Sequence, residues 1–173
     1  MKTIERLYNM LDSAASSLQS PFLLAVRLYW GWQFVQTGLG HINHLDKVTD
    51  YFGSLGIPAP SLMAPLISML ELGGGVLLAA GLASRLIAFL LTCNMMVAFI
   101  TGDREALFSI FSDPDKFYAA APYTFLIACL LVLIFGPGKF CVDALLARRW
   151  QSFTARPGRL PNETLPLASS RRP

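Results

Sequence analysis

Four long apolar stretches dominate the pattern of hydrophobic and polar positions, at about residues 21–40, 60–81, 84–101 and 120–137. About 20 mostly apolar residues are enough for a helix to cross the roughly 30 Å of hydrocarbon in a bilayer. Because a backbone in lipid has to satisfy its own hydrogen bonds, each stretch is expected to be a helix. The second and third are joined by a tight connection, which predicts antiparallel neighbours. The pattern as a whole predicts an all-α fold, an integral membrane four-helix bundle.

Residues 1–20 have a different pattern, in which apolar side chains recur at helical spacing between charged and polar ones. The apolar positions are Ile4, Leu7, Tyr8, Leu11, Ala14, Ala15 and Leu18. An apolar stripe beside a charged face is typical of an amphipathic helix that lies on the membrane surface. No basic region is followed directly by an apolar core, so we expect no cleavable signal peptide. A frayed polar leader is the alternative interpretation.

The two longest connections are expected to fold into short helices at one face of the bundle. In residues 41–59, apolar side chains recur at helical spacing until glycines and prolines break the pattern, which predicts an interfacial helix followed by a turn. In residues 102–118, Asp103 is placed to cap a short helix that ends near Phe111, and Asp113 with the following proline predicts a turn. Together the two connections are expected to form a lid over the bundle.

Composition and charge support a membrane protein and give it an orientation. The chain has 173 residues, of which 54% are hydrophobic and 14% charged, whereas soluble domains carry about 25% charged residues. With the N-terminus in the cytoplasm, ten of the 14 Lys and Arg residues lie on the cytoplasmic side and three on the outer side. Lys and Arg favour cytoplasmic loops, so we expect a multi-pass protein of the bacterial inner (plasma) membrane with both termini cytoplasmic.

The net charge of +3 is explained by this topology and by contact with anionic lipid. No basic-aromatic patch of the nucleic-acid-binding type is present, so nucleic acid is not an expected partner. The chain divides into an interfacial helix (1–20), a transmembrane part (21–147) and a tail (148–173). The tail contains prolines and arginines without periodicity, which predicts a disordered basic cytoplasmic segment.

Three polar residues are expected to share one layer inside the bundle. A carboxylate in hydrocarbon costs roughly 2.5–3.5 kcal/mol on insertion scales, so Glu71 should face the protein interior and have a partner. At 1.5 Å per residue, Glu71 and Asn94 lie ~15 Å from the cytoplasmic ends of their spans and Arg27 lies ~9–10 Å deep. An extended arginine covers the difference. We therefore predict an Arg27–Glu71 ion pair with Asn94 beside it.

This polar layer has two interpretations, and the sequence leaves both open. In the functional one, it binds a quinone head group or relays a proton, with Gln33 at a similar depth and Trp30, Phe34 and Trp32 as candidates to line an apolar site. In the structural one, the ion pair fixes helix register, because buried pairs often add little net stability. The aromatic residues then only pack. The run Gly73–Gly75 predicts close helix approach rather than a phosphate loop.

Signals for a metal or a nucleophile are weak. His41 and His44 are three residues apart and would present two ligands, but no third ligand is fixed by spacing, so a solvated face is the interpretation we adopt. Cys93, Cys129 and Cys141 are an odd number without a CxxC motif, which argues against a disulfide relay. Each is expected to be a small buried apolar residue. We predict no metal site.

Several short motifs follow one another in order over residues 21–147. They are Arg27, Gly31 and Gly38; the segment 51–60, YFGSLGIPAP; Glu71-Leu72-Gly73-Gly74 with Gly81 and Arg85; Met96-Val97-Ala98; and Gly136-Pro137-Gly138-Lys139-Phe140 with Asp143-Ala144-Leu145-Leu146. In this combination the chain resembles the DoxX/DoxD-type family of small four-helix membrane proteins. It departs from the family near His41, where a lysine is common, and at Pro122–Tyr123, where an acidic residue often begins the fourth span.

The resemblance implies a membrane subunit of a redox system, as in a quinone-linked thiosulfate oxidoreductase or in oxidative-stress complexes. We expect an accessory subunit that contacts the quinone pool and a redox partner protein, with a homo-oligomer also open. The chain has no haem ligand pair, iron–sulfur motif or redox dithiol, so no covalent cofactor is expected and electrons would come from the partner. The alternative is a non-catalytic scaffold or chaperone-like membrane protein. A small-molecule transporter is disfavoured because four spans leave little room.

Overall fold

The computed structural model describes residues 2–144 and residue 146, and within these residues all regular structure is helical. The predicted all-α class is confirmed. The predicted tail, 148–173, lies outside the described residues. The helices are α1 (Lys2–Asn43), α2 (Leu45–Ser54), α3 (Pro60–Ala80), α4 (Ser84–Thr101), α5 (Arg104–Phe108), α6 (Pro114–Ala119) and α7 (Ala121–Phe135).

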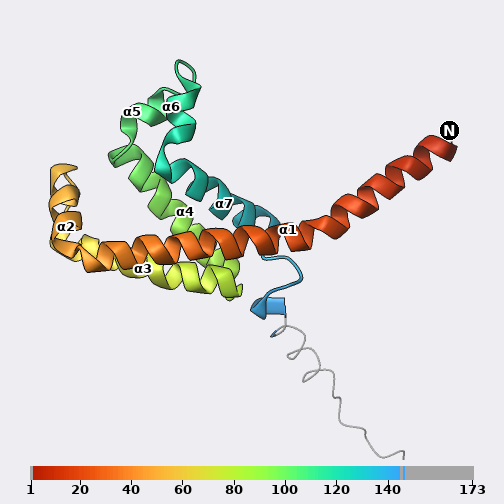
Figure 1. Ribbon diagram of the computed structural model, residues 1–173, viewed down its shortest axis with the longest axis horizontal. Helices are drawn as coiled ribbons and strands as arrows, with labels where there is room; N and C mark the ends of the chain where they lie inside the picture. The colour runs from red at the N-terminus through yellow and green to blue at the C-terminus, as the bar shows by residue number, and fades with distance from the viewer. Residues whose placement is uncertain (1, 145, 147–173) are drawn as a thin grey trace, which may run out of the picture.

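Helix α1 joins two segments that the sequence predicts separately. It continues for 42 residues through Pro21, and its N-terminal part turns away from the direction of the rest (Figure 1). Proline removes one backbone donor and crowds the preceding turn, which bends a helix without always ending it. The apolar side chains from Ile4 to Leu18 are exposed. The helical state of this segment is confirmed, and its position on a membrane surface stays a prediction.

Helices α1 and α3 lie side by side because glycines let their backbones come close (Figure 1). A Cβ atom added to Gly38 would lie 2.5 Å from the backbone nitrogen of Leu72, and one added to Gly75 would lie 2.7 Å from the carbonyl oxygen of Gly31. The predicted close approach is therefore confirmed at Gly75. It is wrong at Gly73, whose added Cβ would meet nothing within 4 Å.

The second close pair is α4 and α7, and a common core joins it to α1 and α3. Phe34, Leu78, Leu91, Cys129 and Val132 come from the four helices and are fully buried. Helices α3 and α4 are antiparallel neighbours connected by three residues, as predicted. We call the end of the molecule with this connection the hairpin end, and the opposite end, with α2, α5 and α6, the loop end (Figure 1).

The short helices at the loop end agree in part with the predictions. Helix α2 is the helix expected in 41–59, but α5 ends at Phe108 rather than near Phe111. Asp103 makes no capping hydrogen bond, whereas the Asp113 carboxylate accepts one from the backbone N–H of Lys116. The predicted turn at Asp113 is therefore the start of α6. The reason is that the proline after Asp113 has a fixed φ that suits the first helical position.

Two helices, α3 and α4, are long and apolar enough to cross a membrane, judged by length and composition within the described residues. Helix α7 is apolar but has 15 residues, which is ~22 Å at 1.5 Å per residue. Two of the four predicted spans therefore meet this criterion. The four-span bundle and its orientation remain predictions.

Candidate functional site

A cavity of about 780 Å³ lies between the helices toward the loop end. It is lined by residues of α1, α2, α3, α4 and α7, and the shared core of the four helices closes it toward the hairpin end. Helix α2 covers it with apolar side chains such as Val48, Tyr51 and Phe52. No residue of α5 or α6 lines it. The predicted lid is thus present for α2 and wrong for α5 and α6.

A buried carboxylate marks the polar part of this cavity. Glu71 is 4% exposed, and its two oxygens have partners from two other helices. The side-chain amide of Asn94 on α4 donates to Oε1 over 3.1 Å, and His41 Nδ1 on α1 lies 2.8 Å from Oε2. Three helices thus meet at one carboxyl group, and the predicted contact between Glu71 and Asn94 is confirmed.

Local structure explains why these three residues meet. Glu71 precedes Leu82 by eleven residues and Asn94 follows Ala83 by eleven, so a tight hairpin brings them to the same level. His41 is brought there by the close contact of Gly38 with Leu72, next to Glu71. A hydrogen-bonded carboxyl with a histidine and an amide beside it can accept or donate hydrogen bonds to a ligand and can exchange a proton.

The predicted Arg27–Glu71 pair is wrong. Arg27 is fully buried at the hairpin end, where its guanidinium donates to the carbonyl oxygen of Phe140 and lies against Gly81. Arg27 is eleven residues from Gly38, which is ~16 Å along the helix. Arg27 therefore lies at the end of the helices opposite to the cavity. The predicted depth of Arg27 was counted from Pro21, but α1 continues through Pro21, so this residue does not mark a level shared with the ends of α3 and α4. The glycine contacts fix a different register, with Arg27 opposite the last turn of α3.

Arg27 belongs instead to a hairpin-end cluster with Asp143. One Asp143 oxygen accepts the backbone N–H of Ala83 at 2.8 Å, and the other accepts the N–H and hydroxyl of Ser84 at 3.0 and 3.1 Å. Desolvation by itself raises the pKa of Asp143, but these hydrogen bonds, with a smaller effect of the Arg27 charge, hold it below its usual value. Asp143 therefore caps α4 and ties the segment after α7 to the helix hairpin.

Residues 22–104 match the family model described as DoxX. These residues belong to the DoxX family. The matched segment holds His41, Glu71 and Asn94, whereas α7, which supplies Phe125 to the cavity, lies beyond it.

Three known proteins are similar in sequence to this chain. A putative oxidoreductase, CatD, of Bacillus subtilis is 36% identical over 85 residues, which is 49% of this chain and 62% of that protein. The chain thus covers less than two thirds of the length of CatD. The inner membrane protein YqjF of Escherichia coli is 27% identical over 134 residues, 77% of this chain and 98% of that protein. The uncharacterized membrane protein Rv3486 of Mycobacterium tuberculosis is 27% identical over 143 residues, which is 79% of this chain and 88% of that protein. No solved structure matches.

The structure brings some of the other predicted site residues to the cavity and leaves others outside it. Phe34 lines the cavity. Trp30 does not line it, but its ring packs 4.9 Å from that of Phe125, which does. Gln33 does not line it and donates to the Tyr29 hydroxyl over 3.3 Å. Cys93 is exposed and lines the cavity, so the prediction of a buried residue is wrong for Cys93.

His41 is the cavity residue that sequence reasoning missed, since it was considered only as a surface metal ligand. Its Nδ1 is occupied by Glu71, and His44 Nδ1 lies 3.1 Å from the Gly40 carbonyl oxygen. The sequence signal that could have identified His41 as a cavity residue was its position in the chain. His41 stands near the position where the resemblance leads one to expect a lysine, so a basic side chain at this place could have been considered as a partner of Glu71.

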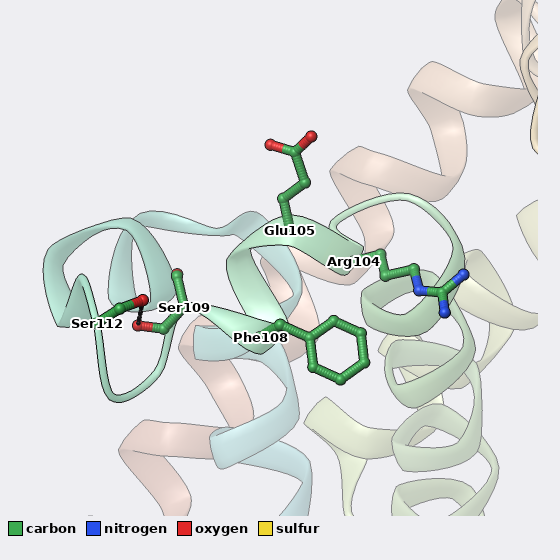
Figure 2. A pocket seen from close by; sticks show the side chains of 5 residues that line it. All are labelled: Arg104, Glu105, Phe108, Ser109 and Ser112. Carbon is green, nitrogen blue, oxygen red and sulfur yellow. Dashed lines mark hydrogen bonds between the residues drawn. The ribbon is translucent and has the colours of Figure 1, made fainter.

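A second hollow, on α5 at the loop end, does not have the features of a site. Figure 2 shows Arg104 beside the ring of Phe108, with its guanidinium carbon 5.6 Å from the ring centre. Glu105 points away to bond Lys116 at 2.9 Å, and the hydrogen bond and charge of Lys116 lower the pKa of Glu105. Ser109 donates to a carbonyl within its own turn. Glu105 and Ser109 thus already have hydrogen-bond partners within the protein.

Proposed function

We propose that this DoxX-family membrane protein binds the head group of a quinone beside Glu71 and Asn94, as an accessory subunit of a quinone-linked redox or oxidative-stress system. The observation that carries the proposal is a buried carboxyl, with amide and imidazole partners, in an otherwise mostly apolar cavity of about 780 Å³. Small-molecule sites have volumes of roughly 300–1,000 Å³ and combine apolar walls with a few placed polar groups.

The chemistry of the three residues suits both redox forms of such a ligand. A quinone carbonyl accepts hydrogen bonds, which the Asn94 amide and the His41 imidazole can donate, and a quinol hydroxyl donates to the Glu71 carboxylate. Reduction of a quinone to a quinol takes two electrons and two protons. Glu71 and His41 are placed to pass the protons, while a partner protein supplies the electrons. The name of the Bacillus subtilis relative, putative oxidoreductase, supports a redox role.

The proposal includes a membrane arrangement in which α1, α3, α4 and α7 span the inner membrane with both termini cytoplasmic. It is supported by apolar side chains that point away from the protein, among them Leu62 and Met69 on α3, Phe89 on α4 and Ile134 on α7. Such a surface suits contact with lipid. The Escherichia coli relative is named an inner membrane protein.

A second function is favoured by a different observation. Both Glu71 oxygens already have partners from the protein, so the polar layer is complete without a ligand. In that case Glu71 would align α1, α3 and α4, and the chain would act as a non-catalytic membrane scaffold. Buried polar contacts of this kind are known to select register and partner.

Binding of a quinone analogue to protein purified in mild detergent separates the two functions. We expect the wild type to bind and Glu71→Ala to lose about tenfold to a hundredfold in affinity, because a hydrogen bond to a charged group contributes ~1.5–3 kcal/mol. Gln33→Ala is the matched control, since Gln33 lies on α1 outside the cavity, and it should bind as the wild type does. Equal binding by Glu71→Ala, or no binding by the wild type, would favour the scaffold.

A further inference from the structure

The cavity has two different rims. Toward the loop end it is bordered by Lys47, Thr101 and Asp103, which can face water. Along α4, in contrast, Leu90 and Val97 both line the cavity and are exposed, at 39% and 53%, as is Cys93. A residue that belongs to the cavity wall and to the outer surface at once marks an opening in the side of the molecule.

The facing edge of this opening is formed by α3. Met63, Ile67 and Leu70 line the cavity there and are half-buried. We call these three residues, together with Leu90, Cys93 and Val97, the lateral mouth. None of the six is charged. A mouth that opened to water would gain from a polar rim, whereas this one matches hydrocarbon.

Two other parts of the cavity wall are closed by packed side chains. Between α1 and α7, the ring of Phe125 packs on Trp30 and on Phe34, with ring centres 4.9 and 4.7 Å apart. Nearer the hairpin end, α3 and α4 are in contact, since a Cβ added to Gly74 would lie 3.2 Å from Leu91. Beyond this contact, residues of both helices line the cavity, and the Asn94–Glu71 hydrogen bond crosses between α3 and α4 at that level.

We propose that the ligand enters sideways from the bilayer through the lateral mouth, and that it is an amphiphile dissolved in the membrane. Its polar head group reaches Asn94 and Glu71, and its apolar tail leaves between α3 and α4 into lipid. This inference rests on the proposed function and narrows its ligand class to molecules with an apolar tail, because the rim of the lateral mouth is apolar.

The native thiol of Cys93 reports on the lateral mouth. The protein is placed in lipid nanodiscs and treated either with an N-alkyl maleimide that dissolves in the bilayer or with a sulfonated maleimide that stays in water. Decylubiquinone is the ligand probe, and its binding is measured separately. The control is Met96→Cys in a Cys93→Ser background, because Met96 is exposed on α4 but does not line the cavity.

We expect the bilayer-dissolved reagent to modify Cys93 and the sulfonated one not to. Decylubiquinone at ten times its Kd should slow the modification about elevenfold, the factor set by occupancy, and should leave the rate at the Met96→Cys control unchanged. Binding of decylubiquinone without protection of Cys93, or modification by the sulfonated reagent at the same rate, would overturn lateral entry and leave the proposed function standing. If decylubiquinone does not bind at all, the proposed function and this inference fail together.

Discussion

Replacing Gly38 by alanine tests the contact that aligns α1 with α3 and thereby places His41 beside Glu71. The new Cβ would lie 2.5 Å from the backbone nitrogen of Leu72 and 2.9 Å from its Cα. Because both are backbone atoms, they cannot rotate away as a side chain would, and the two helices have to separate. Overpacking of this kind costs typically ~1–3 kcal/mol.

The matched variant is Gly40→Ala, two residues farther along the same helix, where an added Cβ meets nothing within 4 Å. Alanine is favoured over glycine inside a helix by ~1 kcal/mol, and this gain is common to both variants. The difference between them therefore isolates the steric clash. At about 2–4 °C per kcal/mol for a chain of this size, Gly38→Ala should melt roughly 2–12 °C below Gly40→Ala.

The assay is thermal unfolding of both variants and the wild type, purified in the same mild detergent and followed by circular dichroism. Gly40→Ala is expected to be at least as stable as the wild type. If Gly38→Ala melts at the same temperature as Gly40→Ala, the close approach of α1 to α3 does not exist, and the placement of His41 that depends on it has to be abandoned.

Three further predictions follow from the structure. The stability losses of Arg27→Gln and Glu71→Gln should add within about 0.5 kcal/mol in the double variant, because the two side chains lie at different ends of the helices. Strong non-additivity would instead support an Arg27–Glu71 ion pair. Asp143→Ala should lower stability at neutral pH by ~0.5–2 kcal/mol as a helix cap is lost. Since the folded pKa of Asp143 lies below its ordinary value of 3.8, the wild-type advantage should be present above that value and disappear as the pH falls through the folded pKa, and an advantage that grew in acid would contradict the assignment. For topology, a cysteine at Ser54 should react with an impermeant thiol reagent from outside intact cells and one at Ser169 should not; labelling at Ser169 would reverse the orientation.

Short-range signals in the sequence were enough to predict α3 and α4 and the pairing between them. Pro60 and Gly81 are strong start and stop signals, and the three-residue connection leaves one register for the hairpin. That register makes Glu71 and Asn94 neighbours, so this half of the candidate site could be predicted from residue numbers alone.

The position of α1 could not be predicted in the same way. The segment between α1 and α3 contains α2, so no short turn fixes their relative shift. The shift is determined by which glycines face each other, and that depends on three-dimensional contacts of Gly31, Gly38 and Gly75. For this reason Arg27 was placed at the wrong level and His41 was not recognised as the second partner of Glu71.

Photo-crosslinking with an azido-quinone in lipid nanodiscs, followed by mass spectrometry of the labelled peptides, would locate a quinone site beside Glu71. We expect adducts on cavity-lining residues of α3 and α4, near Leu70 and Asn94, that disappear when excess unlabelled quinone is present. Adducts confined to outward-facing residues such as Met69 and Phe89, or adducts that excess quinone does not reduce, would contradict it.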